Sequence, residues 1–169
     1  MPKFSYYKKL TKKEKAIYDK SDAIVVARVK DPQAFLPFLN KIKMALAQED
    51  ASAVQRECAA CLKALSAVFF VSVPKMKVLA VRPSNSHGEL HGLYQFEGGP
   101  QHAVITLWLR TVKQKKVVAF KTFFRTLIHE FLHHLDYTAL QLEDSFHTQG
   151  FYKRENSLTK QLFSVLEVK

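Results

Sequence analysis

One short motif in this sequence has the residue types and spacing to hold a metal ion: His129-Glu130-Phe131-Leu132-His133. On an α-helix, side chains four residues apart lie on one face, about one turn apart. Two imidazole nitrogens at that spacing can both reach one Zn²⁺ at about 2.0–2.1 Å. Glu130 would lie on an adjacent face, where its carboxylate can act as general base toward a water that the metal activates. The motif therefore predicts a hydrolase with one Zn²⁺ per chain.

A third histidine, His147, follows His133 after thirteen intervening residues that end in a turn-like break. Catalytic zinc usually takes three protein ligands and keeps one position open for water or substrate. We therefore predict that His129, His133 and His147 bind the metal and that Glu130 is the catalytic residue.

Other ionisable residues near the motif are alternative ligands or supporting groups. Glu143 and Glu155 could each supply a carboxylate ligand. His134 is displaced by about 100° around the helix from His133 and is not expected to share its metal. Asp136 lies on the ligand face, close to one turn after His133, and is expected to orient an imidazole or to cap nearby backbone.

The motif lies within Val117–Leu140, a segment that predicts a long helix because its apolar residues recur at helical spacing. His129 and His133 fall roughly opposite the apolar stripe of this helix, together with the small residues Thr122 and Thr126. The stripe is formed by Phe120, Phe124, Leu127, Phe131 and Leu135. One face is therefore expected to meet a core while the other opens toward a site.

The rest of the chain predicts an α+β fold in one domain, residues 1–169. Residues 1–73 are expected to be helical, and residues 74–169 to hold a small antiparallel sheet, the long helix and a C-terminal helix. The expected helices are Lys12–Lys20, one that starts at Pro32 with Asp31 as N-cap, Ala51–Val68 and Phe151–Leu166, and the expected strands are Lys77–Arg82, Leu90–Phe96 and Ala103–Thr111. Short links between the strands favour an antiparallel meander.

The strand Ala103–Thr111 could contact a substrate if it forms an edge of the sheet. An extended peptide can add to such an edge through backbone hydrogen bonds, and Trp108 and Arg110 could then touch it. Core packing for the tryptophan and edge solubility for the arginine are the alternatives. Three further histidines of this region are expected at the surface or in turns, although one could line a cleft: His87, His91 and His102.

The motif, the gap of thirteen residues and the run His147-Thr148-Gln149-Gly150-Phe151 together resemble the SprT-like zinc metallopeptidases, which include Spartan and small bacterial relatives. The resemblance covers roughly Ala103–Leu166, and the chain is similar to the small bacterial type because no cysteine-rich zinc ribbon is present. It implies a zincin-type fold, zinc bound by the three histidines, and hydrolysis of peptide bonds in a protein or peptide substrate.

In a reaction of this class, Glu130 would accept a proton from the attacking water and later pass it to the departing amine. A further donor to the developing oxyanion is desirable. Tyr137, Tyr152 and His134 are the candidates that the sequence offers.

The chain is strongly basic, with 26 Lys and Arg against 15 Asp and Glu and a net charge of +11. Residues 1–20 carry seven lysines and two acidic residues, and residues 98–129 carry six Lys and Arg with no acidic residue. Such clusters either form a solvated basic face or attract nucleic acid or acidic protein surfaces. An alternative function is therefore a basic nucleic-acid-binding protein whose zinc site is structural or degenerate.

The only cysteines are Cys58 and Cys61. They could form a redox pair or half of a zinc knuckle, but their helical context favours packing as small apolar residues. The longest apolar run, around Ala67–Val73, is far too short to cross a bilayer. With no visible secretory signal, the expectation is a soluble cytoplasmic protein with no membrane partner.

Overall fold

The computed structural model describes residues 1–167, and within them it contains five α-helices and a small mixed sheet. This arrangement confirms the predicted α+β class. The helices are α1 (Lys12–Ala23), α2 (Leu36–Ala47), α3 (Ala51–Phe69), α4 (Phe120–Thr138) and α5 (Gln149–Ser164). The sheet is formed by β1 (Lys75–Val81), β4 (Gly92–Gln95) and β5 (Val104–Arg110), and β2 (Ser84–Asn85) pairs with β3 (Gly88–Glu89) in a separate hairpin. Three 3₁₀ turns complete the described chain: η1 (Ser5–Lys9), η2 (Pro32–Phe35) and η3 (Pro100–His102).

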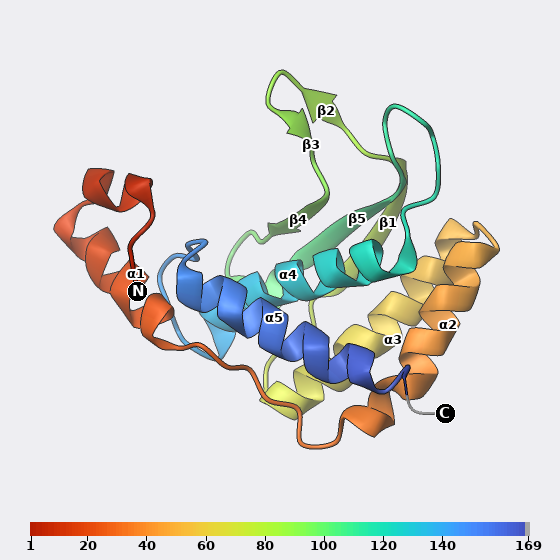
Figure 1. Cartoon of the computed structure of the whole chain (residues 1–169), viewed down its shortest axis with the longest axis horizontal. Helices are drawn as coiled ribbons and strands as arrows, with labels where there is room; N and C mark the ends of the chain where they lie inside the picture. Colours follow the sequence, from red (N-terminus) through yellow and green to blue (C-terminus); the bar gives the residue numbers. More distant parts are fainter. Residues whose placement is uncertain (168–169) are drawn as a thin grey trace.

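Helix α4 lies between the sheet and α5, in the middle of the molecule (Figure 1). The antiparallel pair α2 and α3 covers the β1 side of the sheet, and α1 lies at the opposite end, beside the start of α5 (Figure 1). One continuous apolar core joins the helical first third of the chain to the sheet and to α4. The central position of α4 agrees with its predicted role as the helix that carries the site.

The predicted antiparallel meander is wrong for one pair of strands. The strand order is β1-β5-β4, and β5 runs parallel to β1 but antiparallel to β4. After β1 the chain crosses through the β2–β3 hairpin to the far side of the sheet, forms β4 there, and returns to place β5 in the middle. The short links suggested that each strand pairs with the next one in the sequence. Instead, the β2–β3 hairpin carries the chain past the position beside β1, and β5 later fills that position.

This order also corrects the prediction that β5 could be an edge strand open to substrate. Both sides of β5 are paired, and β4 has a neighbour on one side only. Trp108 is buried, and Arg110 donates a hydrogen bond to the carbonyl of Lys115 and forms an ion pair with Glu49. Neither side chain lines the cleft to which His129, His133 and Glu130 belong.

Side-chain caps explain where several helices begin. Thr11 and Glu14 form a reciprocal capping box at α1, Asp50 accepts a hydrogen bond from the Ala53 amide at α3, and Thr148 accepts one from the Phe151 amide at α5. The prediction at Asp31 is only half right. Pro32 opens the turn η2, but Asp31 makes no capping bond, and α2 begins at Leu36.

The two cysteines and the stripe of α4 lie in the core, as their spacing predicted. Cys58 and Cys61 are free thiols with no exposed surface. Of the stripe, Phe124, Leu127 and Phe131 are fully buried and Leu135 is nearly so, whereas Phe120 is half-buried and packs against the core. Within residues 1–167, the helices are too short or too polar for any of them to pass through a lipid bilayer.

Candidate metal centre

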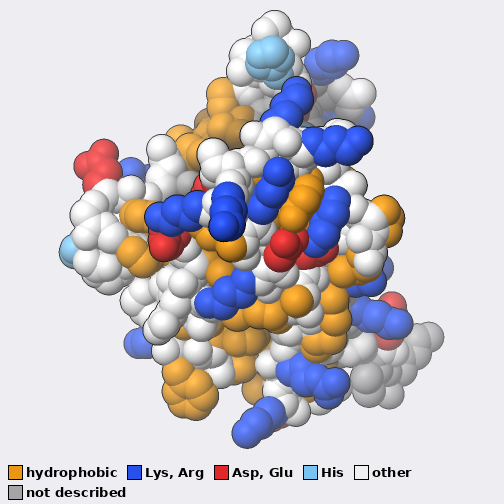
Figure 2. Space-filling view, turned by 90° about the vertical axis from the view of Figure 1, so that its left-hand side faces the viewer, with side chains coloured by type: hydrophobic (Ala, Val, Ile, Leu, Met, Phe, Trp, Pro, Cys, Tyr) orange, Lys and Arg blue, Asp and Glu red, His pale blue; other side chains and the backbone are white. Residues whose placement is uncertain are grey.

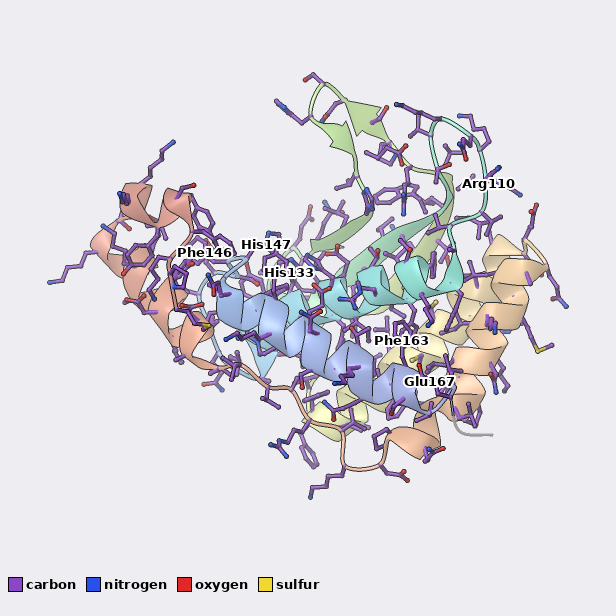
Figure 3. The ribbon with its side chains drawn as sticks, in the orientation of Figure 1. Arg110, His133, Phe146, His147, Phe163 and Glu167 are labelled. Atoms are coloured by element: carbon purple, nitrogen blue, oxygen red, sulfur yellow. The ribbon has the colours of Figure 1, made fainter. Side chains whose placement is uncertain are left out.

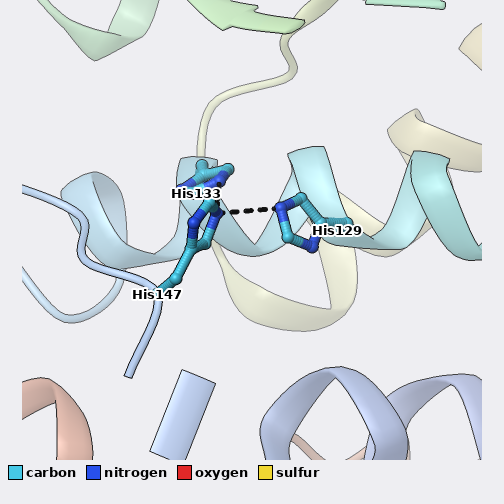
Figure 4. Close-up of side chains that lie close together, drawn as sticks. All are labelled: His129, His133 and His147. Atoms are coloured by element: carbon cyan, nitrogen blue, oxygen red, sulfur yellow. Dashed lines mark hydrogen bonds between the residues drawn. The ribbon is translucent and has the colours of Figure 1, made fainter. Parts of the chain in front are cut away.

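Three histidine side chains converge on one point beside α4 (Figure 4). The Nε2 atom of His147 lies 3.0 Å from Nε2 of His129 and 3.0 Å from Nε2 of His133. An ion held tetrahedrally at about 2.0–2.1 Å from each nitrogen would separate the nitrogens by roughly 3.3 Å. The group therefore has close to the size that one zinc ion needs. Within residues 1–167, His129, His133 and His147 are the three side chains that lie close enough to one another to share a metal ion.

The helical period brings His129 and His133 together. Thr122, Thr126, His129 and His133 all line the same cleft, on the side of α4 that faces away from the buried stripe. The ring centroids of His129 and His133 are 5.0 Å apart. Burial, and after it the neighbouring imidazoles, lower the pKa of His133 to about 3. The ring is therefore neutral at pH 7, which is the form that binds metal.

The imidazoles of His129 and His133 each form a hydrogen bond at Nδ1, on the side of the ring away from the shared point. Nδ1 of His129 lies 2.8 Å from Oε2 of Glu155. Nδ1 of His133 lies 2.7 Å from Oγ of Ser145, whose hydroxyl donates to Asp136 at 2.7 Å. Since Glu155 and the Ser145 oxygen can only accept here, both Nδ1 atoms carry the proton. Both Nε2 lone pairs then face the shared point, as metal ligation requires.

Glu155 therefore lies behind His129 and is not one of the side chains that converge on the shared point. Burial alone would raise the pKa of its carboxyl, but the hydrogen bonds and charges of His129 and Arg125 outweigh this and lower it. The carboxylate stays ionised at neutral pH, so it remains an acceptor for the imidazole proton. Glu143, the other carboxylate considered as a ligand, pairs with Lys13 at the surface.

Glu130 lines the same cleft and is only 6% exposed. Burial raises the pKa of its carboxyl to about 7, with His129 lowering it and Glu155 raising it further. A carboxyl with a pKa near neutrality can both accept and return a proton at physiological pH, which suits a general base.

The cleft around these residues has a volume of about 700 Å³, and the free edge strand β4 runs along it. The residues that line it come from β4 and the residues before it, from α4, from the loop after α4, and from the start of α5: Leu90, His91, Gly92, Leu93, Tyr94, Thr122, Arg125, Thr126, Tyr137, Ser145, Tyr152 and Glu155, besides the three histidines and Glu130. Figure 3 shows His133 and His147 side by side, with Arg110 far from them.

The remaining expectations have separate outcomes. His134 is fully buried, accepts a hydrogen bond from the Tyr94 hydroxyl at Nδ1 (3.0 Å) and donates from Nε2 to the Ser72 carbonyl (2.7 Å). It therefore shares no metal with His133, as predicted, and it has no free proton for an oxyanion. His91 lines the cleft, whereas His87 and His102 do not. Asp136 orients an imidazole as expected, although it acts through Ser145.

Sequence reasoning missed Ser145 and Gly92 as parts of the site. Ser145 precedes His147 by two residues, but nothing in its own neighbourhood indicates that its hydroxyl would bridge His133 and Asp136. Gly92 lies in a predicted strand, where an isolated glycine can mark a close approach of another segment. The glycine at position 92 was therefore a sequence signal for close packing of another segment against this strand.

Comparison of the chain with models of protein families, with curated proteins and with solved structures gives no match. The resemblance to SprT-like metallopeptidases therefore stays a prediction that rests on the two sequence motifs.

Proposed function

We propose that this protein is a zinc-dependent metallopeptidase of the SprT-like type. The observation that carries the proposal is the convergence of three histidine Nε2 atoms in one cleft with the buried carboxyl of Glu130. His129, His133 and His147 would hold the ion. When bound, zinc supplies a Lewis acid that polarises a peptide carbonyl and makes water a better nucleophile near neutral pH.

Glu130 performs the proton transfers. Its carboxylate takes a proton from the water as the water oxygen attacks the carbonyl carbon. It then delivers that proton to the amide nitrogen as the carbon–nitrogen bond breaks, and the products are a carboxylic acid and an amine. The pKa of about 7 at Glu130, raised by burial, favours both halves of this exchange.

Strand β4 offers a place for an extended substrate. Its backbone pairs with β5 on one side only, and Leu90–Tyr94 line the cleft. A peptide segment in extended conformation can add to such an edge through backbone hydrogen bonds, which would place its carbonyls beside the histidines. This mode of binding favours unfolded or flexible segments of proteins as substrates.

Tyr152 is the best placed of the three donors considered for the oxyanion. It is 40% exposed, it lines the cleft, and its ring lies 5.8 Å from that of His147. The hydroxyl of Tyr137 already donates to Asp144, and both nitrogens of His134 are engaged. Tyr152 can therefore offer its proton to substrate.

The ligand set favours catalysis over a structural zinc site. Structural zinc is usually closed by four protein ligands, most often cysteines, and both cysteines here are buried in the core.

Figure 2 looks onto the end of the molecule where α1 lies, and Lys and Arg side chains are spread over it with acidic side chains between them. A basic nucleic-acid-binding protein is the second candidate, and it predicts affinity that falls steeply with salt.

The test compares the unmodified protein with Glu130→Gln and His147→Ala. Each is assayed for zinc content by metal analysis and for cleavage of an unstructured protein such as casein, with and without DNA. Glu130→Gln is expected to keep about one zinc per chain and to lose cleavage, because glutamine cannot accept the proton. His147→Ala is expected to lose zinc as well.

Two results would count against the proposal. Equal cleavage by Glu130→Gln and the unmodified protein would remove Glu130 from the mechanism. Salt-sensitive DNA binding without any zinc-dependent cleavage would favour the second candidate.

A further inference from the structure

The third ligand is presented by a loop and not by a helix. His147 lies between α4 and α5, one residue before the N-cap Thr148, and its side chain is exposed. The positions of His129 and His133 follow from the period of α4, but a ligand in a loop needs contacts from elsewhere to stay in place. The described structure supplies those contacts from the other end of the chain.

Residues 2–24, which we call the N-terminal segment, bind this loop at several points. The hydroxyl of Tyr6 donates to the backbone carbonyl of His147 at 2.9 Å. The Gln149 side chain donates to the carbonyl of Pro2 at 2.7 Å, and Nζ of Lys20 donates to the carbonyl of Leu140 at 3.1 Å.

Packing and burial strengthen these contacts. The ring of Phe146, next to the ligand, lies 6.2 Å from that of the fully buried Tyr18, and Figure 3 shows Phe146 on the side of the loop that faces α1.

The end of α1 lies directly against the start of α5. The Gly150 amide donates to Oδ1 of Asp22 at 2.9 Å, and a side chain at Gly150 would collide with the backbone of Asp22. The glycine therefore permits an approach that any larger residue would prevent. This contact fixes the first turn of α5, which follows His147 by two residues.

The same segment is also connected to His133. Arg154 is 3% exposed and donates to the carbonyls of Ser21 and Ile24 as well as to Asp136. Asp136 in turn accepts from Ser145, the partner of His133. A continuous chain of hydrogen bonds therefore runs from the end of α1 to a second ligand.

We infer that the N-terminal segment is a structural part of the metal centre, and that Tyr6 is a positioning residue for the ligand His147. The inference rests on the proposed role of the three histidines in binding zinc. It goes beyond the motif, because it assigns a function to residues that lie more than 100 positions before it in the sequence.

The experiment compares two conservative variants of the full chain, Tyr6→Phe and Tyr7→Phe. Each removes one hydroxyl from the same turn, but the Tyr7 hydroxyl donates to Asp19 within the segment and not to the loop. Zinc affinity is measured by competition with a chromophoric chelator, and the geometry of the site is measured by the visible absorption of bound Co²⁺. The melting temperature of the metal-free protein reports any general loss of stability.

Tyr6→Phe is expected to weaken zinc binding about 3- to 10-fold, which is the size of effect expected when one hydrogen bond is lost. It is also expected to change the Co²⁺ spectrum. Tyr7→Phe should stay within about 2-fold of the unmodified protein. A third variant, Tyr6→Ala, also loses the contacts of the ring with Phe4 and Tyr18 and should bind zinc more weakly than Tyr6→Phe.

Unchanged zinc affinity and Co²⁺ spectrum in Tyr6→Phe would overturn the inference, as would equal losses in Tyr6→Phe and Tyr7→Phe. The proposed function fails separately. If the unmodified protein binds zinc but cleaves no protein, the peptidase proposal is wrong while the affinity comparison still decides the role of Tyr6. If it binds no zinc, both are wrong.

Discussion

Gly92 of the edge strand lies directly against Glu130 of α4. A Cβ atom added to Gly92 would be 2.5 Å from Oε1 of Glu130 and 2.7 Å from Cγ2 of Thr126. The strand can approach the helix this closely only because glycine has no side chain at that position. The proposed substrate edge and the proposed general base are therefore in direct contact, and the contact depends on one residue.

The first prediction concerns this contact. Gly92→Ala should displace the Glu130 carboxylate or push β4 away from α4, and either change should lower kcat/KM for casein cleavage by at least about 10-fold. Zinc content should not change, because the atoms that an added Cβ would meet first belong to Glu130 and Thr126 and not to a histidine. Gln95→Ala, in the same strand but outside the cleft, is the matched control. Full activity in Gly92→Ala would show that the close approach is unimportant for the reaction.

A second prediction concerns the support of His133. Ser145→Ala removes the acceptor for the imidazole Nδ1 proton and leaves the buried Asp136 without one of its donors. Zinc affinity should fall about 10- to 100-fold, the usual effect of losing such a partner. Chelator competition measures it, and Ser164→Ala, at the exposed end of α5, serves as control. Equal affinities in the two variants would contradict the role of Ser145.

The third prediction separates binding of the metal from stabilisation of the oxyanion. Tyr152→Phe should lower kcat about 100-fold, within the range found when one oxyanion donor is removed, and should keep one zinc per chain. Tyr137→Phe should have a much smaller effect, since its hydroxyl is engaged with Asp144. Steady-state kinetics on a fluorogenic peptide would show the difference. A drop confined to KM would assign Tyr152 to substrate binding instead.

The cysteines provide a prediction that does not depend on the metal. Burial raises the pKa of the Cys61 thiol to about 12 and that of Cys58 well above its usual range. Because only the thiolate reacts, and it forms as the pH rises through the pKa, both residues should be inert at pH 8 in the folded protein. Ellman's reagent should react at least 100-fold faster after denaturation in guanidinium, when the pKa returns to about 8.5. Fast reaction of the native protein would place a cysteine outside the core.

Much of the helical structure could be predicted from the sequence. The segments around α3, α4 and α5 were identified to within a few residues, because their apolar residues repeat with the helical period. The same period placed His129 and His133 on the open face of α4, and that face does line the cleft. These are local properties, since residues three or four apart in a helix are neighbours whatever the rest of the chain does.

The sequence by itself therefore determined the candidate metal-binding residues, their spacing and the helix that presents two of them. Only the tertiary structure decided which strand forms the edge beside them, since strand order depends on how the hairpin after β1 carries the chain across the sheet. It also decided that Ser145 and Glu155 would support the imidazoles, that Gly92 would meet Glu130, and that Tyr6 would hold His147. Each of these pairs is brought together by packing between segments that are distant in sequence or joined by an irregular loop. A local pattern can mark one partner, as the isolated glycine at position 92 does, but it does not identify the other.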